Sequence, residues 1–274
     1  MWLKPRRCRS KRIETAYQAY SCGRQTLFDL SQSTGKAVST LRRAFDLLTP
    51  SSSRLPIPAE PVALTFDGTF FGRGYGLLIY RAQGRNIYWQ EIESERICDM
   101  EAGLLHLRDQ GWRFSSITID GRKGAISLVN RLFSDMPVQL CLFHQKAIVR
   151  RYLTGHPKTL CGKELRALVA FLGFIPEKIF MDCLDDLRKR YADFLKERNE
   201  LNQFKHRRLR SALRSLRSNA PYLFTYERFP ERGIPHTTNS CDGSFAHWKN
   251  KVKIHRGLRK ERRAKMIAFL LSKS

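Results

Sequence analysis

The chain has 274 residues, enough for one sizeable domain and a small one, and 42% of them are hydrophobic, which excludes disorder by composition. Its 50 Lys and Arg against 25 Asp and Glu give a formal net charge of +25, and this excess calls for a polyanionic partner, by default nucleic acid. The basic start has no apolar stretch behind it, and no apolar run approaches the roughly 20 residues of a membrane span, so we expect neither a signal peptide nor a membrane partner. Seven scattered cysteines favour a reducing, cytoplasmic compartment over a disulfide framework.

Three short helices are predicted within residues 1–48, at 13–20, 27–33 and 39–48, with Gly35 between the second and the third. Ser39 is placed to cap the third helix, whose polar face then carries Thr40, Arg42 and Arg43. This layout is typical of a helix-turn-helix, in which the second motif helix enters the major groove. The alternative is a small helical bundle with no role in DNA binding.

A stiff linker and a larger domain follow. Residues 49–61, TPSSSRLPIPAEP, are rich in Pro and Ser and predict the linker. In residues 62–274 we predict a three-stranded meander, then a helix, a strand, a helix and a strand, which together make a mixed sheet with helices on its faces. The predicted bounds are 62–71, 75–81 and 86–92 for the meander, then 97–110, 115–119, 125–133 and 138–143. Residues 145–218 have a helical, charged pattern, and 238–251 is predicted as the last core helix.

Two aspartates lie in or at the tip of predicted strands, Asp67 in LTFDGTF and Asp120 in SITIDGRKG. A carboxylate in such a position is costly unless it has a partner, and a metal ion is one such partner. Two aspartates on adjacent strands would suit a pair of Mg²⁺ or Mn²⁺ ions better than zinc. The alternative is that each aspartate opens a turn with the glycine that follows it.

Cys141 and His144 lie where a strand should become a helix, in VQLCLFHQ. Their spacing could begin a zinc site, but a structural zinc needs four ligands and no second pair lies nearby. A buried thiol and a hydrogen-bonded histidine are therefore the favoured interpretation.

Two further regions add to the basic character of the N-terminal segment. One is a helical stripe, and the other is the run WKNKVKIHRGLRKERRAK, which holds one acid against nine Lys or Arg. A single charge run is usually a solvated face, but three basic regions around one core favour contact with phosphates. The predicted DNA-binding residues of these two regions are Arg207, Arg210 and Arg214 in the stripe and Lys249, Lys251, Lys253 and Arg256 in the run.

Several motifs in order resemble the transposases of bacterial insertion sequences related to the Mutator superfamily, in the subgroup with an N-terminal zinc ribbon. They are ETAYQAYSCGRQTLFDL, TFDGTFF, TIDGRKG, CLFHQKAIVRRYL, LRSLRSNAPYLFTY and TTNSCDGSFAHWKNKVKIHRGLRKERR. The resemblance covers nearly the whole chain. It implies an α/β, ribonuclease H-like (retroviral integrase-like) core with an all-helical insertion at about residues 151–218, preceded by the helix-turn-helix domain.

The family carries an Asp, Asp, Glu triad that binds two Mg²⁺ or Mn²⁺ ions, and the resemblance places Asp67 and Asp120 in the first two positions. Cys141 and His144 match the family's Cys-x-x-His signature beside the active site. The third acid follows Thr-Asn in the pattern T-N-x-x-E-G, and here Thr238 and Asn239 lead to Asp242. Aspartate is shorter than glutamate by one methylene, about 1.5 Å, and misplacing a catalytic group by about 1 Å can cost roughly 100-fold in rate.

The cysteine pairs of the zinc ribbon are missing, because Cys8 and Cys22 cannot replace them, so we interpret the chain as truncated before the ribbon and expect no zinc. The resulting hypothesis is a DNA transposase that moves an insertion sequence, by cut-and-paste or copy-out, through metal-dependent phosphodiester hydrolysis and strand transfer. The family implies terminal inverted repeats and target DNA as double-stranded partners, a homo-oligomer on DNA, and a place at the bacterial nucleoid. The alternatives are a catalytically degenerate DNA-binding derivative and a metal-dependent nuclease of the same fold.

Overall fold

A computed structural model describes residues 6–49, 55–255 and 257–272, with the backbone alone for residues 6–10, 123 and 239–242. The chain divides into two compact units. One contains Ile57–Gly84 and Tyr88–Cys241, and the other contains Met1–Pro56, Arg85–Ile87 and Asp242–Ser274. Within the described residues, no helix is both long and apolar enough to cross a membrane.

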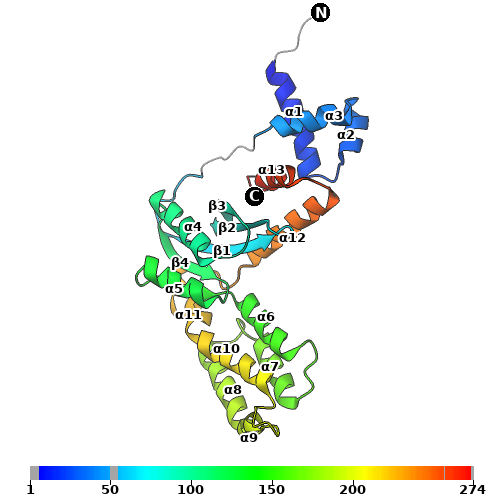
Figure 1. The fold of residues 1–274 in the computed structure, drawn as a ribbon. Helices are drawn as coiled ribbons and strands as arrows, with labels where there is room; N and C mark the ends of the chain where they lie inside the picture. The colour runs from blue at the N-terminus through cyan, green and yellow to red at the C-terminus, as the bar shows by residue number, and fades with distance from the viewer. Residues whose placement is uncertain (1–5, 50–54, 256, 273–274) are drawn as a thin grey trace, which may run out of the picture. The chain divides into compact units, whose positions relative to one another are not determined.

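A five-stranded mixed sheet organises the larger unit (Figure 1). Its strands are β1 (Val62–Phe70), β2 (Gly76–Ala82), β3 (Arg85–Ile92), β4 (Phe114–Ile119) and β5 (Val138–Leu140). Their order across the sheet is β3-β2-β1-β4-β5, with β1 antiparallel to β2 and parallel to β4, and β4 parallel to β5. The prediction of a mixed sheet that begins with a three-stranded meander is therefore confirmed.

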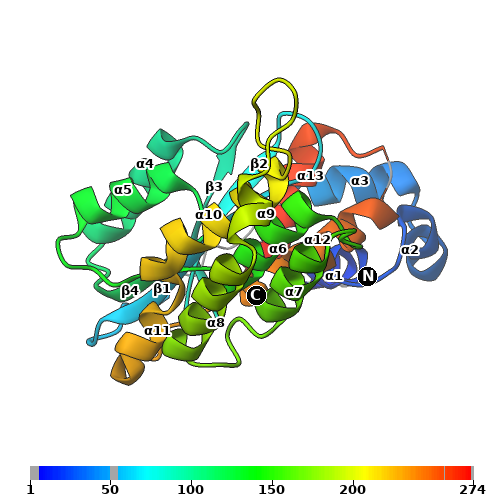
Figure 2. The same ribbon diagram turned by 90° about the horizontal axis from the view of Figure 1, so that it is seen from below.

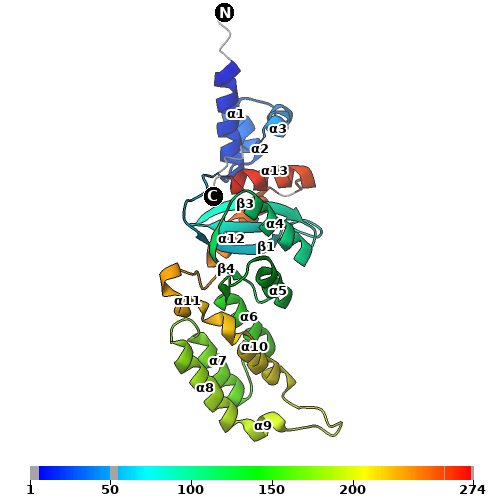
Figure 3. The same cartoon turned by 90° about the vertical axis from the view of Figure 1, so that its left-hand side faces the viewer.

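The meander forms because its turn residues accept left-handed backbone conformations. Gln83 and Gly84 connect β2 to β3 with φ values of 50° and 74°, as the two central residues of a type I′ hairpin turn require. On one face of the sheet lie α4 (Ile97–Asp109) and α5 (Lys123–Leu132), side by side (Figures 1 and 3). Helix α4 packs closely on β2, because the Tyr80 hydroxyl donates to the backbone oxygen of Met100 at 3.2 Å.

A helical segment leaves the sheet after β5 and returns to it before residue 234. Helices α6, α7, α8 and α10 pack in a bundle, which Figure 2 shows from below. Its elements are α6 (Leu142–Leu153), α7 (Leu160–Ala170), α8 (Glu177–Arg190), α9 (Ala192–Lys196), α10 (Arg207–Leu223), α11 (Thr225–Arg228) and η1 (Pro230–Arg232). Buried Gln145 ties α6 to α10, because it donates to Ser215 Oγ at 3.2 Å and accepts from Asn219 Nδ2 at 2.8 Å.

The smaller unit joins the two ends of the chain. Its helices are α1 (Arg6–Ser21), α2 (Leu27–Thr34), α3 (Val38–Leu47), α13 (Lys260–Leu271) and all but the first three residues of α12 (Asn239–Ile254). The Tyr17 ring of α1 meets the Phe269 ring of α13 with centroids 5.0 Å apart, and Arg262 of α13 pairs with Asp46 of α3. This division differs from the expected one, which assigned residues 62–274 to a single catalytic domain.

Two local predictions at the ends of the chain are wrong. Ser39 does not cap α3, because the N-cap position is held by Ala37, whose side chain can make no cap hydrogen bond. The helix predicted at 238–251 is not the last one, because α13 follows it with Met266, Ile267 and Leu270 buried at helical spacing. The many Lys and Arg residues in this segment gave it a charged pattern, so the apolar face of α13 was not predicted.

Candidate active site

Three adjacent parallel strands, β1, β4 and β5, lead to candidate site residues at matching positions of their register. The register pairs Thr65 of β1 with Thr118 of β4, and Thr118 with Gln139 of β5. Successive side chains of a strand alternate between faces, so residues two apart share a face. Two residues further along the chain lie Asp67, inside β1, and Asp120 and Cys141, each one residue past the end of its strand. The two aspartates therefore lie at the same level of neighbouring strands.

Asp67 is buried inside β1 and does not open a turn, because the strand continues through Gly68 to Phe70. The Gly68 N–H donates to Asp67 Oδ1 at 2.8 Å. A Cβ on Gly68 would lie 2.9 Å from Glu95 Cδ and closer still to Oε1, so a side chain here would displace the Glu95 carboxylate. The absence of a side chain at residue 68 thus leaves room for the Glu95 carboxylate against β1.

Glu95 is a third acidic residue near the site, and Arg122 links it to Asp120. Arg122 Nη1 donates to the Glu95 backbone oxygen at 2.7 Å, and its Nη2 pairs with the Glu95 carboxylate. Arg122 Nε lies 3.8 Å from Asp120 Oδ2. Burial raises the pKa of Glu95, and the charge of Asp120 raises it further, while Arg122 and His144 oppose the shift. One guanidinium thus offsets the charge of neighbouring carboxylates.

Glu95 was missed by sequence reasoning, because it lies in the polar segment ESER between β3 and α4 and matches no motif. The available signal was Gly68 itself, since a glycine in the middle of a strand often marks the close approach of another group. Within the residues whose side chains are described, no group of three His, Cys, Asp or Glu stands arranged to hold a metal ion.

Cys141 and His144 are brought together with Thr238. Cys141 follows β5 as the N-cap residue of α6, and its thiol is buried. Thr238 donates to Cys141 Sγ through its backbone N–H at 3.2 Å and through Oγ1 at 3.3 Å, and Oγ1 lies 3.5 Å from His144 Nδ1. Burial raises the pKa of the Cys141 thiol, but the hydrogen bonds from His144 and Thr238 outweigh it, and the net shift is downward.

These contacts anchor the segment that precedes α12. The Thr118 hydroxyl donates to the Pro235 oxygen at 2.7 Å, and the Leu142 N–H donates to the His236 oxygen at 3.0 Å. Asp242 follows the anchored Thr238 by four residues and lies on the first turn of α12, but its side chain is outside the described part of the structure.

The predicted DNA-binding residues of α10 differ in whether their side chains already contact other parts of the protein. Arg207 and Arg214 are exposed and make no hydrogen bond or ion pair with any residue that the structure describes. Arg210 instead donates to the Leu195 oxygen at 2.9 Å and stacks 3.7 Å from the centroid of the Phe204 ring. Arg210 therefore holds α10 against the segment that precedes it. Arg207 and Arg214 are the predicted residues of the stripe whose side chains could bind a phosphate.

In the smaller unit the predicted cations also separate into two kinds. Lys251 donates to the Gly23 oxygen at 3.0 Å and so links α12 to the end of α1. Lys249 and Lys253 are exposed, and Arg256 lies outside the described residues.

The polar residues of α3 do not share one face. Thr40 and Arg43 are exposed and three residues apart, so they lie on the same face, opposite buried Leu41 and Phe45. Arg42 lies about 100° around the helix from Arg43, on the flank that carries Asp46.

Comparison with protein-family profiles gives no match, and comparison with curated protein sequences gives none either. Among solved structures, the chain is similar to the Drosophila P element transposase strand transfer complex, with 14% sequence identity and a TM-score of 0.36. The similarity covers 92% of this chain and 65% of that one, so the chain spans a little under two thirds of the length of its structural neighbour. At this TM-score the similarity assigns neither a fold nor an activity to the chain.

Proposed function

We propose that this chain is a DNA transposase with a metal-dependent carboxylate site on a ribonuclease H-like core. The observation that carries the proposal is the placement of Asp67 and Asp120 at one level of the neighbouring parallel strands β1 and β4. A meander followed by two parallel strands, each reached through a helix, is the arrangement that we assign to this core. The motif order around these residues points to the same family.

The donor set fits a hard divalent cation, because carboxylate oxygens suit Mg²⁺ or Mn²⁺. Asp67, Asp120 and Asp242 are the proposed ligands. A metal pair held there would supply Lewis-acid activation of the attacking and leaving oxygens of a phosphodiester. The chain's own contribution is to position these carboxylates, to offset their charge with Arg122, and to anchor Thr238 on Cys141 ahead of Asp242.

Double-stranded DNA is the proposed partner, both as the terminal inverted repeats of the element and as the target. Helices α2 and α3 are proposed to form the helix-turn-helix, with Thr40 and Arg43 on the groove-facing side. Of the predicted DNA-binding residues of α10 and α12, those that are exposed and make no described contact are proposed to bind backbone phosphates: Arg207, Arg214, Lys249 and Lys253. A homo-oligomer on DNA belongs to the same proposal.

A second candidate is a DNA-binding derivative without catalysis. It is favoured by Asp242 at a position where the family carries a longer acid. It predicts salt-sensitive DNA binding with no metal-dependent cleavage.

Single-turnover cleavage of duplexes made from the DNA that flanks the gene tests the proposal, with Mg²⁺ and then with Mn²⁺ as the more forgiving metal. We expect Asp67→Asn, Asp120→Asn and Asp242→Ala to abolish cleavage without weakening DNA binding, because such a loss belongs to the chemical step. Asp242→Glu should raise the rate. Asp109→Ala is the control, since its side chain is 73% exposed at the end of α4. Equal rates for wild type and Asp242→Ala would remove Asp242 from the site, and binding without cleavage in wild type would favour the second candidate.

A further inference from the structure

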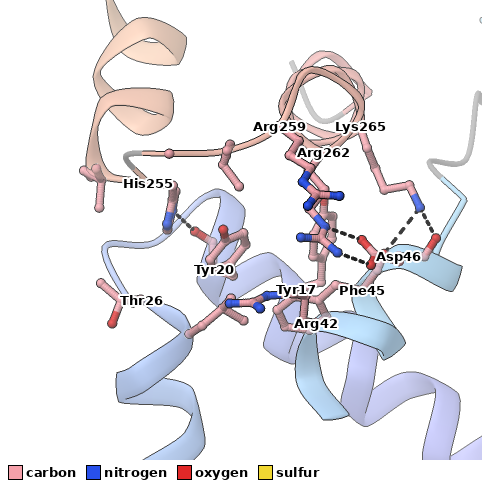
Figure 4. Close-up of a pocket in the computed structure, with 14 residues that line it drawn as sticks. Tyr17, Tyr20, Thr26, Arg42, Phe45, Asp46, His255, Arg259, Arg262 and Lys265 are labelled. Atoms are coloured by element: carbon pink, nitrogen blue, oxygen red, sulfur yellow. Dashed lines mark hydrogen bonds and ion pairs between the residues drawn. The ribbon is translucent and has the colours of Figure 1, made fainter. Parts of the chain in front are cut away.

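A cavity of about 670 Å³ lies within the unit that joins the two chain ends (Figure 4). One side is formed by α1, the start of α2 and α3, and the other by the segment from Ile254 to Lys265. These two sides are more than 200 residues apart in sequence, so no local pattern indicates the cavity.

The floor of the cavity is a packed aromatic cluster. The Phe45 ring lies 5.0 Å from the Tyr17 ring and 5.4 Å from the Tyr20 ring, and the Tyr20 ring lies 4.0 Å from that of His255. All four side chains are buried. His255 Nε2 also lies 2.8 Å from the Tyr20 backbone oxygen, and this hydrogen bond holds the C-terminal segment on α1. The cavity is therefore preformed, because its floor is fixed by ring packing and not by exposed side chains.

The rim of the cavity is positively charged, and part of that charge is already compensated. Arg262 binds Asp46 through two hydrogen bonds of 2.8 and 2.6 Å. Lys265 is held by backbone oxygens at the end of α3. The hydrogen bonds from Arg262 lower the pKa of Asp46, so its carboxylate is ionised and paired at neutral pH. The two cations and the carboxylate thus fasten α13 to α3.

Two arginines at the rim have no such partner. Arg42, on α3, and Arg259, the N-cap residue of α13, are exposed and make no hydrogen bond or ion pair with any described residue. Figure 4 shows Arg42 reaching from one wall and Arg259 lying on the opposite one. A guanidinium matches the geometry of phosphate oxygens, so two guanidinium groups without a hydrogen-bonded partner at one cavity are suited to bind an anion.

We propose that Arg42 and Arg259 bind backbone phosphates of DNA at the mouth of this cavity, so that the DNA-binding unit is built from both ends of the chain. The inference rests on the proposed function for its partner and adds the C-terminal segment to DNA recognition. DNA is favoured over a small anion because Thr40 and Arg43 continue the polar surface along α3, and because the chain carries a net charge of +25. In this arrangement one face of α3 would lie in the DNA groove. Arg42, on the flank of α3, and Arg259 would bind phosphates of the DNA strand beside that groove.

The test is binding of the full chain to a fluorescein-labelled DNA duplex of arbitrary sequence, measured by anisotropy over a series of salt concentrations. Phosphate contacts are independent of sequence, so the ends of the element need not be known. We expect Arg259→Ala and Arg42→Ala each to weaken binding about tenfold at low salt. The slope of log affinity against log salt should fall by about 0.9 for each phosphate that a variant no longer neutralises.

Lys260→Ala is the matched control, because Lys260 is exposed, adjacent to Arg259 and outside the cavity lining. It removes the same net charge and should leave the slope unchanged. Asp46→Asn tests the opposite direction, since it releases Arg262 and should steepen the slope. The thermal unfolding midpoint of each variant is measured alongside, so that slopes are compared only between folded proteins.

Equal slopes for Arg259→Ala, Lys260→Ala and wild type would overturn the inference while leaving the proposed function intact. A wild-type chain that binds no DNA would instead overturn the proposed function. Thermal stabilisation by inorganic phosphate that disappears in Arg259→Ala, with an unchanged DNA slope, would make the cavity a small-anion site and would also overturn the inference.

Discussion

Arg122→Ala removes the guanidinium between Glu95 and Asp120, and we expect this variant to bind Mn²⁺ about tenfold more tightly than wild type. At 3.8 Å and an effective dielectric of about 20, two unit charges interact by about 4 kcal/mol. The Arg122 and Asp120 side chains are 42% and 28% exposed, so solvent screens most of this energy. We take about 1.4 kcal/mol of this interaction energy to remain after screening, and this corresponds to a tenfold change in the affinity for Mn²⁺.

The assay is calorimetric titration of Mn²⁺ into the full chain, which reads metal affinity independently of catalysis. Arg131→Ala is the control, because Arg131 lies on α5, the helix whose N-cap residue is Arg122, and also pairs with a glutamate, Glu101 at 3.0 Å. It changes the same residue type and the same net charge away from Asp120. If Arg122→Ala binds Mn²⁺ no more tightly than Arg131→Ala, Arg122 is a structural brace and does not compete with a metal at these carboxylates.

Two further predictions concern stability. Gly103→Ala on α4 should lower the free energy of unfolding by about 1–3 kcal/mol in urea denaturation, because the added Cβ would lie 2.7 Å from Cε2 of buried Tyr80. Gly243→Ala is the control and should not lower the free energy of unfolding, because its Cβ would have no atom within 4 Å. Burial lowers the pKa of His255 below 6.5 despite its hydrogen bond to Tyr20, so its contribution to stability is complete above about pH 6.5 and is lost as pH falls through the lowered value. The unfolding midpoint of wild type should therefore fall more between pH 7.5 and 5.5 than that of His255→Gln, and equal falls would show that another group sets the pH dependence.

Strand positions were predictable because each strand carries its own local signal. The alternation and length of the apolar runs located β1 within one residue of its observed bounds, and the hairpin turn at Gln83 and Gly84 agrees with the predicted break. Parallel strands reached through a helix bring their carboxyl ends to one edge of the sheet, so the pairing of β1, which carries Asp67, with β4, which Asp120 follows, also agrees with local patterns.

Contacts that join distant segments were not predictable in this way. Glu95 reaches Gly68 and, through Arg122, Asp120, because the segment after β3 folds over Gly68, and no periodicity in that segment encodes this path. Likewise, Phe269 packs on Tyr17 across almost the whole length of the chain. The run from Lys249 to Lys265 was interpreted from its charge as a DNA-binding face, and charge says nothing of which residues a helix buries.

Buried polar side chains on β4 and β5 attach the two ends of the helical segment to the sheet, close to the candidate site. Gln139 is fully buried, and it donates to the Leu223 oxygen at 3.0 Å and accepts from the Tyr226 N–H at 3.0 Å, so the end of α10 and the start of α11 dock on β5. A polar group left unpaired in the core costs free energy, and the strand therefore favours one path of the returning chain over its alternatives. Thr118 holds that path again at Pro235, just before Thr238 meets Cys141. Both ends of the helical segment are thus attached to the same edge of the sheet, and these attachments hold the residues that precede α12 in place.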